Sequence, residues 1–393
     1  MFLAAAPYFA SRFEGNDWIK TNFQSAILTV STIANLTSLL VLTKIQQSAS
    51  YPFRINTALT INIVVFSLLT TSAATFLDAS PAAYFAFLLL AVAAAALAAG
   101  LFQNGAFAFA ASFGRPEYMQ GLMTGQAVAG VLPPVAQVTM VLLFPPVEEA
   151  SRPDHLPSTS RQSSAFLYFL AAVVISVVAL VAFVPLVRRH DRIIENRMVE
   201  HMAESMASIE EAERAARRVT SLWRLFVKLH WLALGVALTF AETMFFPVFT
   251  VKILSVQENA GALFQPAAFI PMAFFFWNAG DFSGRMATML PFTLKHRPLA
   301  LFLLSVLRIC WLPLYLLCNI NGRGAVIPSD LFYLIIVQVL FGLSNGWLGS
   351  SCMMASGLWV DDVEREAAGS FMVLCIVVGL SSGSLLSFTI SGI

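Results

Sequence analysis

Residues 277–286 read WNAGDFSGRM and lie inside an apolar run, between FIPMAFFF and ATMLPF. The polar residues Asn278, Asp281 and Arg285 follow one another at spacings of three and four. On an α-helix these spacings place all three side chains on one face, which Phe274 continues. Asp281 and Arg285 lie one turn apart and can pair. The stripe fits an uncharged ligand that forms hydrogen bonds, and it fits equally a buried ion pair that fixes helix packing.

The composition decides which solvent surrounds this helix. Of the 393 residues, 58% are apolar and 11% are charged, whereas a soluble domain carries about 25% charged residues. We therefore predict an all-α polytopic membrane protein. The net charge of +1 gives no indication of a nucleic-acid partner, and none is expected. The cysteines and histidines show no metal-type spacing, and no nucleotide-binding loop or Ser-His-Asp set occurs. We expect no cofactor, no metal and no enzymatic activity.

A membrane-spanning helix needs about 20 predominantly apolar residues. Ten segments satisfy this requirement: 21–43, 55–77, 82–111, 118–145, 164–187, 229–254, 265–292, 298–318, 329–356 and 367–391. Residues 1–10, MFLAAAPYFA, are apolar but too short to cross, and they have neither the basic n-region nor the cleavage site of a signal peptide. We interpret them as the end of a helix whose first part is missing.

The basic residues indicate the orientation of the spans. Of the 23 lysines and arginines, 15 fall in the loops at 44–54, 112–117, 188–228, 293–297 and 357–366, and 6 fall in the alternate loops. Because cytoplasmic loops carry the excess of basic residues, we predict that the first set is cytoplasmic. The longest of these loops, 188–228, divides the chain into an N-terminal bundle (1–187) and a C-terminal bundle (229–393). This division is typical of a two-bundle transporter.

Several further polar positions lie at membrane depth. A charge in the hydrocarbon core costs about 2.5 kcal/mol or more, so such side chains face a bundle interior or a wet cavity. Single polar residues more often hold helices together than bind a ligand, so the argument for a cavity depends on their number. The positions singled out are Thr32, Asn35, Gln103, Gly125, Gln126, Arg308 and Asn345.

Glu242 lies near the centre of the span LGVALTFAETMFFPVF, with no basic residue close to it in sequence. An unpaired carboxylate in the membrane is costly, so it takes up a proton or finds a partner on another helix. Two interpretations remain open. Glu242 is either a proton-linked or gating carboxylate, or a neutral glutamic acid hydrogen-bonded in a helix contact.

The stretch WNAGDFSGR resembles the N-x-x-D-x-x-G-R motif in the eighth helix of equilibrative nucleoside transporters. Further stretches are similar to other helices of that family in the same order: YMQGLMTGQAVAG to the fifth, MFFPVFTVKI to the seventh, RICWLPLYLLCN to the ninth, LSNGWLGSSCMM to the tenth and EREAAGSFM to the eleventh. The stretch ASYPFRI resembles fungal members, some of which are vacuolar.

The resemblance implies an eleven-helix fold of the major-facilitator type that moves nucleosides, or nucleobases, down their gradients by alternating access. It implies that Gln103, Asn278, Asp281 and Arg285 surround the base and ribose. It implies that Phe274, Phe246 and Pro247 line the cavity. Three residues match by offset only: Thr32, Asn35 and Leu3. Structural or gating roles are expected for Arg308, Glu242, Gly125, Gln126 and Asn345. The expected partners are nucleosides and the lipid bilayer, and the protein is expected to be monomeric.

One departure from the family pattern concerns the first helix. In the family a tryptophan-asparagine pair precedes the equivalent of MFLAAAPYF, whereas this sequence starts after it. We expect either a clipped start or a short isoform. The alternatives are a facilitator for sugars or amino acids, and a truncated, inactive chain or membrane scaffold that acts through 188–228. The choice between vacuolar and plasma membrane, and between purine and pyrimidine, stays open.

Overall fold

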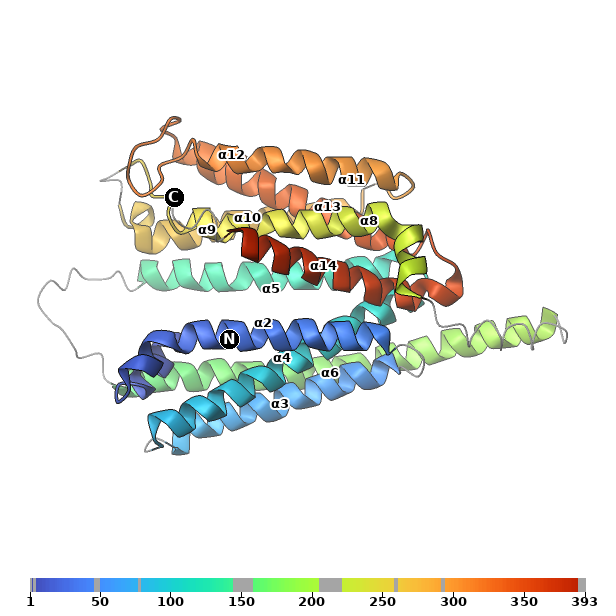
Figure 1. The fold of residues 1–393 in the computed structure, drawn as a ribbon, viewed down its shortest axis with the longest axis horizontal. Coiled ribbons are helices and arrows are strands. Elements are labelled where there is room, and N and C mark those ends of the chain that lie inside the picture. The colour runs from blue at the N-terminus through green and yellow to red at the C-terminus, as the bar shows by residue number, and fades with distance from the viewer. Residues whose placement is uncertain are drawn as a thin grey trace, which may run out of the picture. The chain divides into compact units, whose positions relative to one another are not determined.

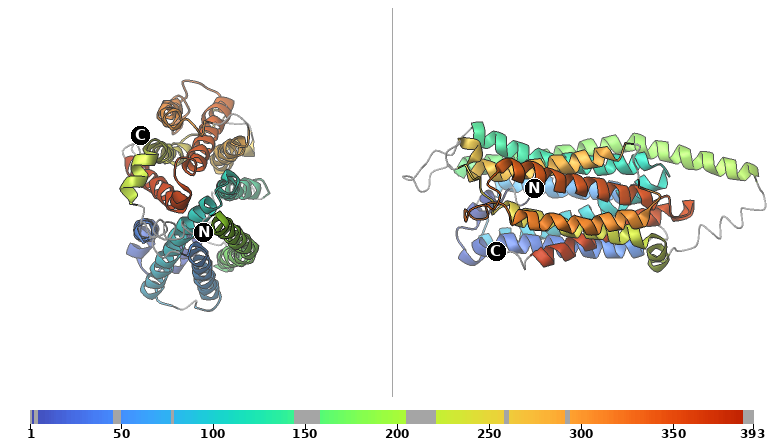
Figure 2. Two further views of the ribbon diagram at one scale, coloured as in Figure 1. Left: turned by 90° about the vertical axis from the view of Figure 1, so that its right-hand side faces the viewer. Right: turned by 90° about the horizontal axis from the view of Figure 1, so that it is seen from above.

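The computed structural model describes residue 2 and residues 5–45, 50–76, 79–143, 158–204, 221–257, 261–290 and 294–387. Within these ranges the regular structure is helical, and the one strand-like feature is an isolated antiparallel bridge between Ile253 and Ile320. The predicted all-α fold is confirmed. A short helix, α1 (Ala6–Arg12), covers part of the apolar segment at the start of the chain. The helices of each unit described below run in similar directions, as the end-on view in Figure 2 shows.

Each expected span coincides with a helix or with adjoining helices. They are α2 (Asp17–Lys44), α3 (Tyr51–Thr75), α4 (Pro81–Ser112), α5 (Pro116–Leu143), α6 (Ser158–Glu204), α8 (Leu222–Thr243) with α9 (Phe245–Thr250), α10 (Pro266–Ala287), α11 (Pro298–Leu307) with η2 (Arg308–Trp311) and α12 (Leu312–Tyr315), η3 (Phe332–Val339) with α13 (Leu340–Ser356), and α14 (Arg365–Ser387).

Among the described residues, eight of these segments are long and apolar enough to cross a membrane. The other two are α5 and α10, and α10 carries the polar residues Asn278, Asp281 and Arg285 that lower its mean hydropathy. The multi-pass character is confirmed, whereas the count of ten complete spans stays a prediction.

The loop expected at 188–228 is shorter in the structure. Helix α6 does not end at 187 but continues to Glu204, and its light-green end extends past the ends of α2 and α3 in Figure 1. No glycine or proline occurs between Val187 and Glu204, and most residues there favour a helix. Helix α8 begins at Leu222, before the expected 229. Residues 205–220 lie outside the described residues.

The helices form two compact units. The first contains residues 1–109 and 150–219, and the second contains 110–149 and 220–393. Helix α5 packs against α10 and α13 in the second unit, although the sequence-based division placed its span in the first bundle. The division at the 188–228 loop stays a prediction.

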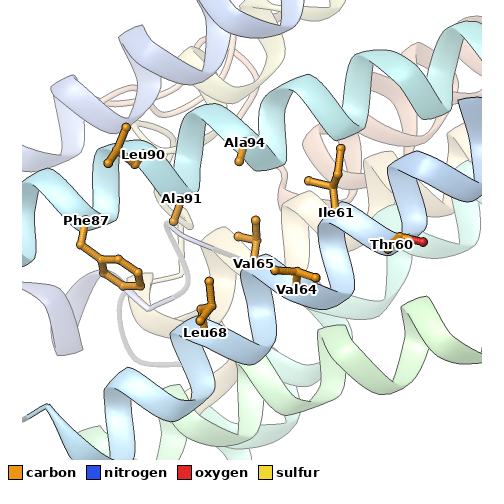
Figure 3. A pocket seen from close by; sticks show the side chains of 9 residues that line it. All are labelled: Thr60, Ile61, Val64, Val65, Leu68, Phe87, Leu90, Ala91 and Ala94. Carbon is orange, nitrogen blue, oxygen red and sulfur yellow. The ribbon is translucent and has the colours of Figure 1, made fainter.

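The first unit has an aromatic core that includes Phe9, Phe13, Phe66 and Phe169. Its outer surface carries an apolar groove of about 450 Å³ between α3 and α4 (Figure 3). The groove is lined by Thr60, Ile61, Val64, Val65, Leu68, Phe87, Leu90, Ala91 and Ala94. Leu90 is 72% exposed, which fits a helix surface that lipid tails solvate.

In the second unit, glycines bring two helix backbones into direct contact. A Cβ atom on Gly280 or Gly284 of α10 would clash with a carbonyl oxygen of η3 or α13. The reciprocal clash holds for Gly342 and Gly346 of α13, which face the carbonyl oxygens of Trp277 and Asp281. Small residues four apart permit this close approach between membrane helices. The packing places α13 directly against the polar face of α10.

Candidate substrate-binding site

The ion pair that the α10 sequence allows is formed. Arg285 Nε lies 2.8 Å from Asp281 Oδ2, and the two side chains are 7% and 5% exposed. Both groups are therefore removed from water. A buried pair of this kind needs further hydrogen bonds to its remaining polar atoms.

Asp281 obtains its second hydrogen bond from α13. Asn345 Nδ2 donates to Asp281 Oδ1 at 2.7 Å. Gly346, the next residue, is the one whose lack of a side chain lets the Asp281 carbonyl approach α13. Asn345 Oδ1 in turn lies 2.7 Å from Thr243 Oγ1 of α8. Each carboxylate oxygen of Asp281 thus holds one protein donor, and each keeps a lone pair for a further donor.

Arg285 connects α10 to α5. Its Nη1 donates to the Met123 carbonyl at 2.8 Å and lies 3.5 Å from Gln126 Oε1. No described residue accepts a hydrogen bond from Nη2. The guanidinium is therefore held through Nε and Nη1, and Nη2 remains able to donate to a ligand.

Asn278 lies against α5 at a position where that helix has no side chain. Its Nδ2 donates to the Phe274 carbonyl one turn earlier at 2.8 Å. A Cβ atom on Gly130 would lie 2.5 Å from Asn278 Oδ1, so glycine at 130 makes room for the amide. Gly125 differs, because a Cβ atom there would meet nothing within 4 Å. The structure gives no packing reason for glycine at 125.

Aromatic rings flank the polar face of α10. Phe246 of α9 stacks on Trp277 with centroids 4.3 Å apart and meets Phe274 edge-on at 5.0 Å. Phe246 is buried, whereas Phe274 and Pro247 are half-buried. Phe246 therefore packs against both Phe274 and Trp277 of α10. Trp277 was not among the predicted residues, although its spacing of four from Asp281 places it one turn away on α10.

Glu242 finds the partner on another helix that the sequence analysis considered. Arg308 Nη1 of η2 lies 3.5 Å from Glu242 Oε2, and both residues are buried. The same guanidinium contacts the Thr239 carbonyl at 2.5 Å and Ser344 Oγ at 3.0 Å, and its Cζ lies 4.1 Å from the Phe341 ring centroid. Glu242 Oε1 is buried and has no hydrogen-bond partner among the described residues.

The two ion pairs belong to one network. Arg308 Nη2 lies 3.3 Å from Thr243 Oγ1, which leads through Asn345 to Asp281. Six of the predicted residues are brought together in this way: Gln126, Glu242, Asp281, Arg285, Arg308 and Asn345. Thr243 was not predicted, since a threonine in a membrane helix commonly bonds its own backbone, and only the contact with Asn345 reveals its role.

Gln103, Asn35 and Thr32 belong to the first unit. Gln103 Oε1 and Asn35 Oδ1 are buried and have no hydrogen-bond partner among the described residues. Asn35 faces Gly100 of α4, where a Cβ atom would lie 3.3 Å from Asn35 Oδ1. Thr32 is exposed, and Leu3 lies outside the described residues. In the same unit Arg54 donates to Asn104 Oδ1, a contact between α3 and α4 that was not predicted.

Comparison with known proteins gives matches along most of the chain. A family model described as nucleoside transporter matches residues 89–391. Nucleoside transporter FUN26 of Saccharomyces cerevisiae is 30% identical over 98% of this chain and 80% of its own length. Human equilibrative nucleoside transporter 1 is 26% identical over 69% of this chain. The chain spans 61% of that human relative, which is less than two thirds of its length.

Solved structures show the fold. The Escherichia coli fucose:proton symporter FucP superposes over 98% of this chain and 90% of its own, with a TM-score of 0.53 and 14% identity. FucP in the outward conformation, described as a major facilitator superfamily transporter, gives a TM-score of 0.56 with 12% identity over the same shares. The predicted major-facilitator-like fold is confirmed. At these identities the likeness concerns the fold alone.

The family match and the yeast relative agree with the motifs of α10, α13 and α14. The yeast relative also confirms the likeness to fungal members. These matches indicate that the chain is a transporter rather than an enzyme. The chain belongs to the nucleoside transporter family.

Proposed function

We propose that this protein carries nucleosides across a membrane by facilitated diffusion, with Asp281 and Arg285 as the polar centre of the binding site. The observation that carries the proposal is the buried Asp281–Arg285 pair, which forms further hydrogen bonds to α5 and α13 and keeps donor and acceptor capacity for a ligand. The relatives named as nucleoside transporters support the choice of substrate class.

The chemistry of the pair suits a neutral ligand with hydroxyl groups. Asp281 accepts one protein hydrogen bond on each oxygen, so vicinal hydroxyls of a ribose can donate to the remaining lone pairs. Arg285 Nη2 can donate to a ribose oxygen. Because the two charges neutralise each other, the site needs no counter-charge on the ligand. Each hydrogen bond contributes about 0.5–1.5 kcal/mol net of water, so affinity is modest and release is easy.

The base is proposed to meet a different set of side chains. Asn278, beside Gly130, offers an amide group for the edge of a base. Gln103 is a proposed contact that rests on the family resemblance. Phe274, which packs against Phe246, offers an aromatic ring that can contact the face of the base. Pro247, Asn35, Thr32 and Leu3 remain proposed contacts that rest on the family resemblance.

The test is uptake of labelled uridine into liposomes that contain the chain starting at Met1. Saturable uptake that unlabelled adenosine competes, and that fucose or an amino acid does not, supports the proposal. Asp281→Asn should abolish uptake when equal amounts of folded, inserted protein are compared, although the loss of the buried counter-charge of Arg285 should lower its thermal stability. The matched control is Asp330→Asn, since Asp330 is also a buried, hydrogen-bonded carboxylate but accepts from Ser255 and Val256 instead. Competition by fucose, or normal uptake by Asp281→Asn, would contradict the proposal.

The orientation and the oligomeric state are separate proposals. The distribution of lysine and arginine supports a cytoplasmic location for residues 188–228. A monomeric carrier is proposed because one chain contains both expected bundles. An epitope inserted within 205–220 tests the orientation in intact cells. Binding of an antibody without permeabilisation would overturn it.

A further inference from the structure

Four charged side chains are buried in the second unit and belong to the polar network described above. Asp281 and Arg285 form a close pair, at 2.8 Å, and Glu242 and Arg308 form a looser one, at 3.5 Å. With all four groups ionised, the network carries no net charge. Uptake of a single proton would leave it with one excess positive charge in a region that excludes water.

The two carboxylates differ in how well their negative charge is held. Both oxygens of Asp281 accept a hydrogen bond shorter than 3 Å, from Arg285 and from Asn345. Glu242 has one distant contact on Oε2, and its buried Oε1 has no partner among the described residues. Hydrogen bonds to a carboxylate favour its charged form, and burial without them favours the neutral form. Of the two carboxylates, Glu242 is therefore the one whose charged form is held by fewer hydrogen bonds.

Arg308 does not depend on Glu242 for its position. Its three nitrogens also contact the Thr239 carbonyl, Ser344 Oγ and Thr243 Oγ1. A proton on Glu242 therefore leaves the guanidinium in place but removes its counter-charge. The next negative charge along the network is Asp281, which is reached through Thr243 and Asn345. Protonation of Glu242 thus changes the electrostatic field that acts on Asp281.

The titratable groups near Glu242 come from its own helix and from the elements packed against it. Arg308 comes from η2, and α10 contributes Asp281 and Arg285 to the same network. Helix α14 packs on the carbonyl oxygens of Ala237 and Ala241 through Gly379 and Gly383. The remaining titratable residues on the elements packed around Glu242 are Arg224, Lys228 and His230 on α8, Cys310 on η2, Tyr315 on α12, Tyr333 on η3, Cys352 on α13, and Arg365, Glu366 and Cys375 on α14. Among these residues and the four of the network, Glu242 and Asp281 are the carboxylates that contact a network arginine.

We infer that Glu242 is a proton-binding residue through which pH acts on ligand binding at Asp281. This inference rests on the proposed nucleoside transport. The proton adds to a Glu242 carboxylate oxygen and forms an O–H bond, with no other bond broken. The relay Arg308–Thr243–Asn345 transmits the change, and Thr243 and Asn345 act as positioning residues for Asp281.

The experiment measures the apparent KM of uridine uptake into liposomes with equal pH on both sides, from about pH 5 to about pH 8. Uridine does not titrate in this range, so the profile reports on the protein. Wild type should show a change of about 5-fold or more that follows one titrating group. Glu242→Gln should give a flat profile at the wild-type acidic limit. Asp330→Asn, the buried carboxylate outside the network, should keep the wild-type profile.

A second measurement covers the case in which Glu242→Gln does not fold. Wild-type protein in detergent should release or take up protons when uridine binds, which calorimetry in two buffers of different ionisation enthalpy detects. A flat wild-type KM profile, or a Glu242→Gln profile like that of wild type, would overturn the inference. Proton exchange of zero on binding would overturn it as well. Absence of any uridine uptake by wild type would instead contradict the proposed function, so the two failures are distinguishable.

Discussion

Asn345 Nδ2 lies 2.7 Å from Asp281 Oδ1, and this contact joins α13 to the central carboxylate of α10. A hydrogen bond to a charged group contributes about 1.5–3 kcal/mol, roughly twice the value of a neutral pair. Removing it frees the Asp281 carboxylate to rotate away from the geometry in which it can receive two hydroxyl groups.

Asn345→Ala should therefore lower kcat/KM for uridine by about 10- to 100-fold, because each 1.4 kcal/mol corresponds to a factor of about ten. Asn345→Asp should lower kcat/KM further than Asn345→Ala, since it places a second negative charge beside Asp281. Initial rates of uptake in liposomes provide the measurement. The control is Ser283→Ala on the exposed face of α10, whose hydroxyl bonds its own helix at the Ala279 carbonyl. Equal rates for Asn345→Ala and wild type would rule out the positioning role.

The contact between α10 and α13 should be sensitive to a single methyl group. Gly346→Ala would drive a Cβ atom into the Asp281 carbonyl oxygen, and backbone atoms cannot move aside as a flexible side chain can. Overpacking of this kind costs about 1–3 kcal/mol. We expect a lower midpoint of thermal unfolding in detergent, together with loss of uptake. Gly125→Ala is the matched control, because a Cβ atom there meets nothing within 4 Å. A similar loss of stability in both variants would show that the helix contact is not the cause.

Much of this site could be predicted from residue spacing, since it lies on one helix. Residues 278, 281 and 285 share a face wherever α10 packs, so the Asp281–Arg285 pair followed from the sequence alone. The partner of Glu242 comes from η2 and the second donor to Asp281 comes from α13. These elements are distant in sequence from α8 and α10, and spacing carries no information on such contacts. The extension of α6 to Glu204 was missed because hydropathy marks where a span ends, whereas a helix continues through polar residues that favour it.

An ion pair between the start of α8 and the exposed Asp361, which precedes α14, gives a prediction for pH dependence. Lys228 Nζ lies 2.9 Å from Asp361 Oδ2, and the hydrogen bond from Lys228 holds the pKa of the Asp361 carboxyl below its ordinary value of 3.8. A carboxyl with a lowered pKa contributes stability above its unfolded pKa and loses that contribution as pH falls through the folded pKa. The thermal midpoint of wild type should therefore decline as pH falls below about 4.

Asp361→Asn should remove part of this decline, because an amide does not titrate. The effect is small, since the Asp361 side chain is 71% exposed and water screens the pair. Thermal unfolding of both proteins at neutral pH and at acidic pH measures it. Glu14→Gln, at an exposed position of the first unit, should keep the wild-type pH dependence. An acidic decline in Asp361→Asn as large as in wild type would assign the effect to other groups.

Gly130 and Asn278 form a pair that can be tested by a double-mutant cycle. Gly130→Ala would place a Cβ atom 2.5 Å from Asn278 Oδ1, and the amide can move away because it is only half-buried. We expect stability close to that of wild type, with a rise in the KM for uridine of about 10-fold, the equivalent of one lost hydrogen bond. Asn278→Ala should raise KM by a similar amount.

The double variant Gly130→Ala with Asn278→Ala should behave like Asn278→Ala alone, because the amide that the added Cβ atom would displace is already gone. When two mutations act through the same interaction, their effects on KM do not add. The difference between the effect of the double variant and the sum of the two single effects measures the coupling. The measurement is the KM for uridine and for adenosine in all four proteins, since displacement of an amide that reads the base should affect the two nucleosides unequally. Additive effects on KM would show that Gly130 and Asn278 act independently, and Asn278 would then lose its proposed role beside α5.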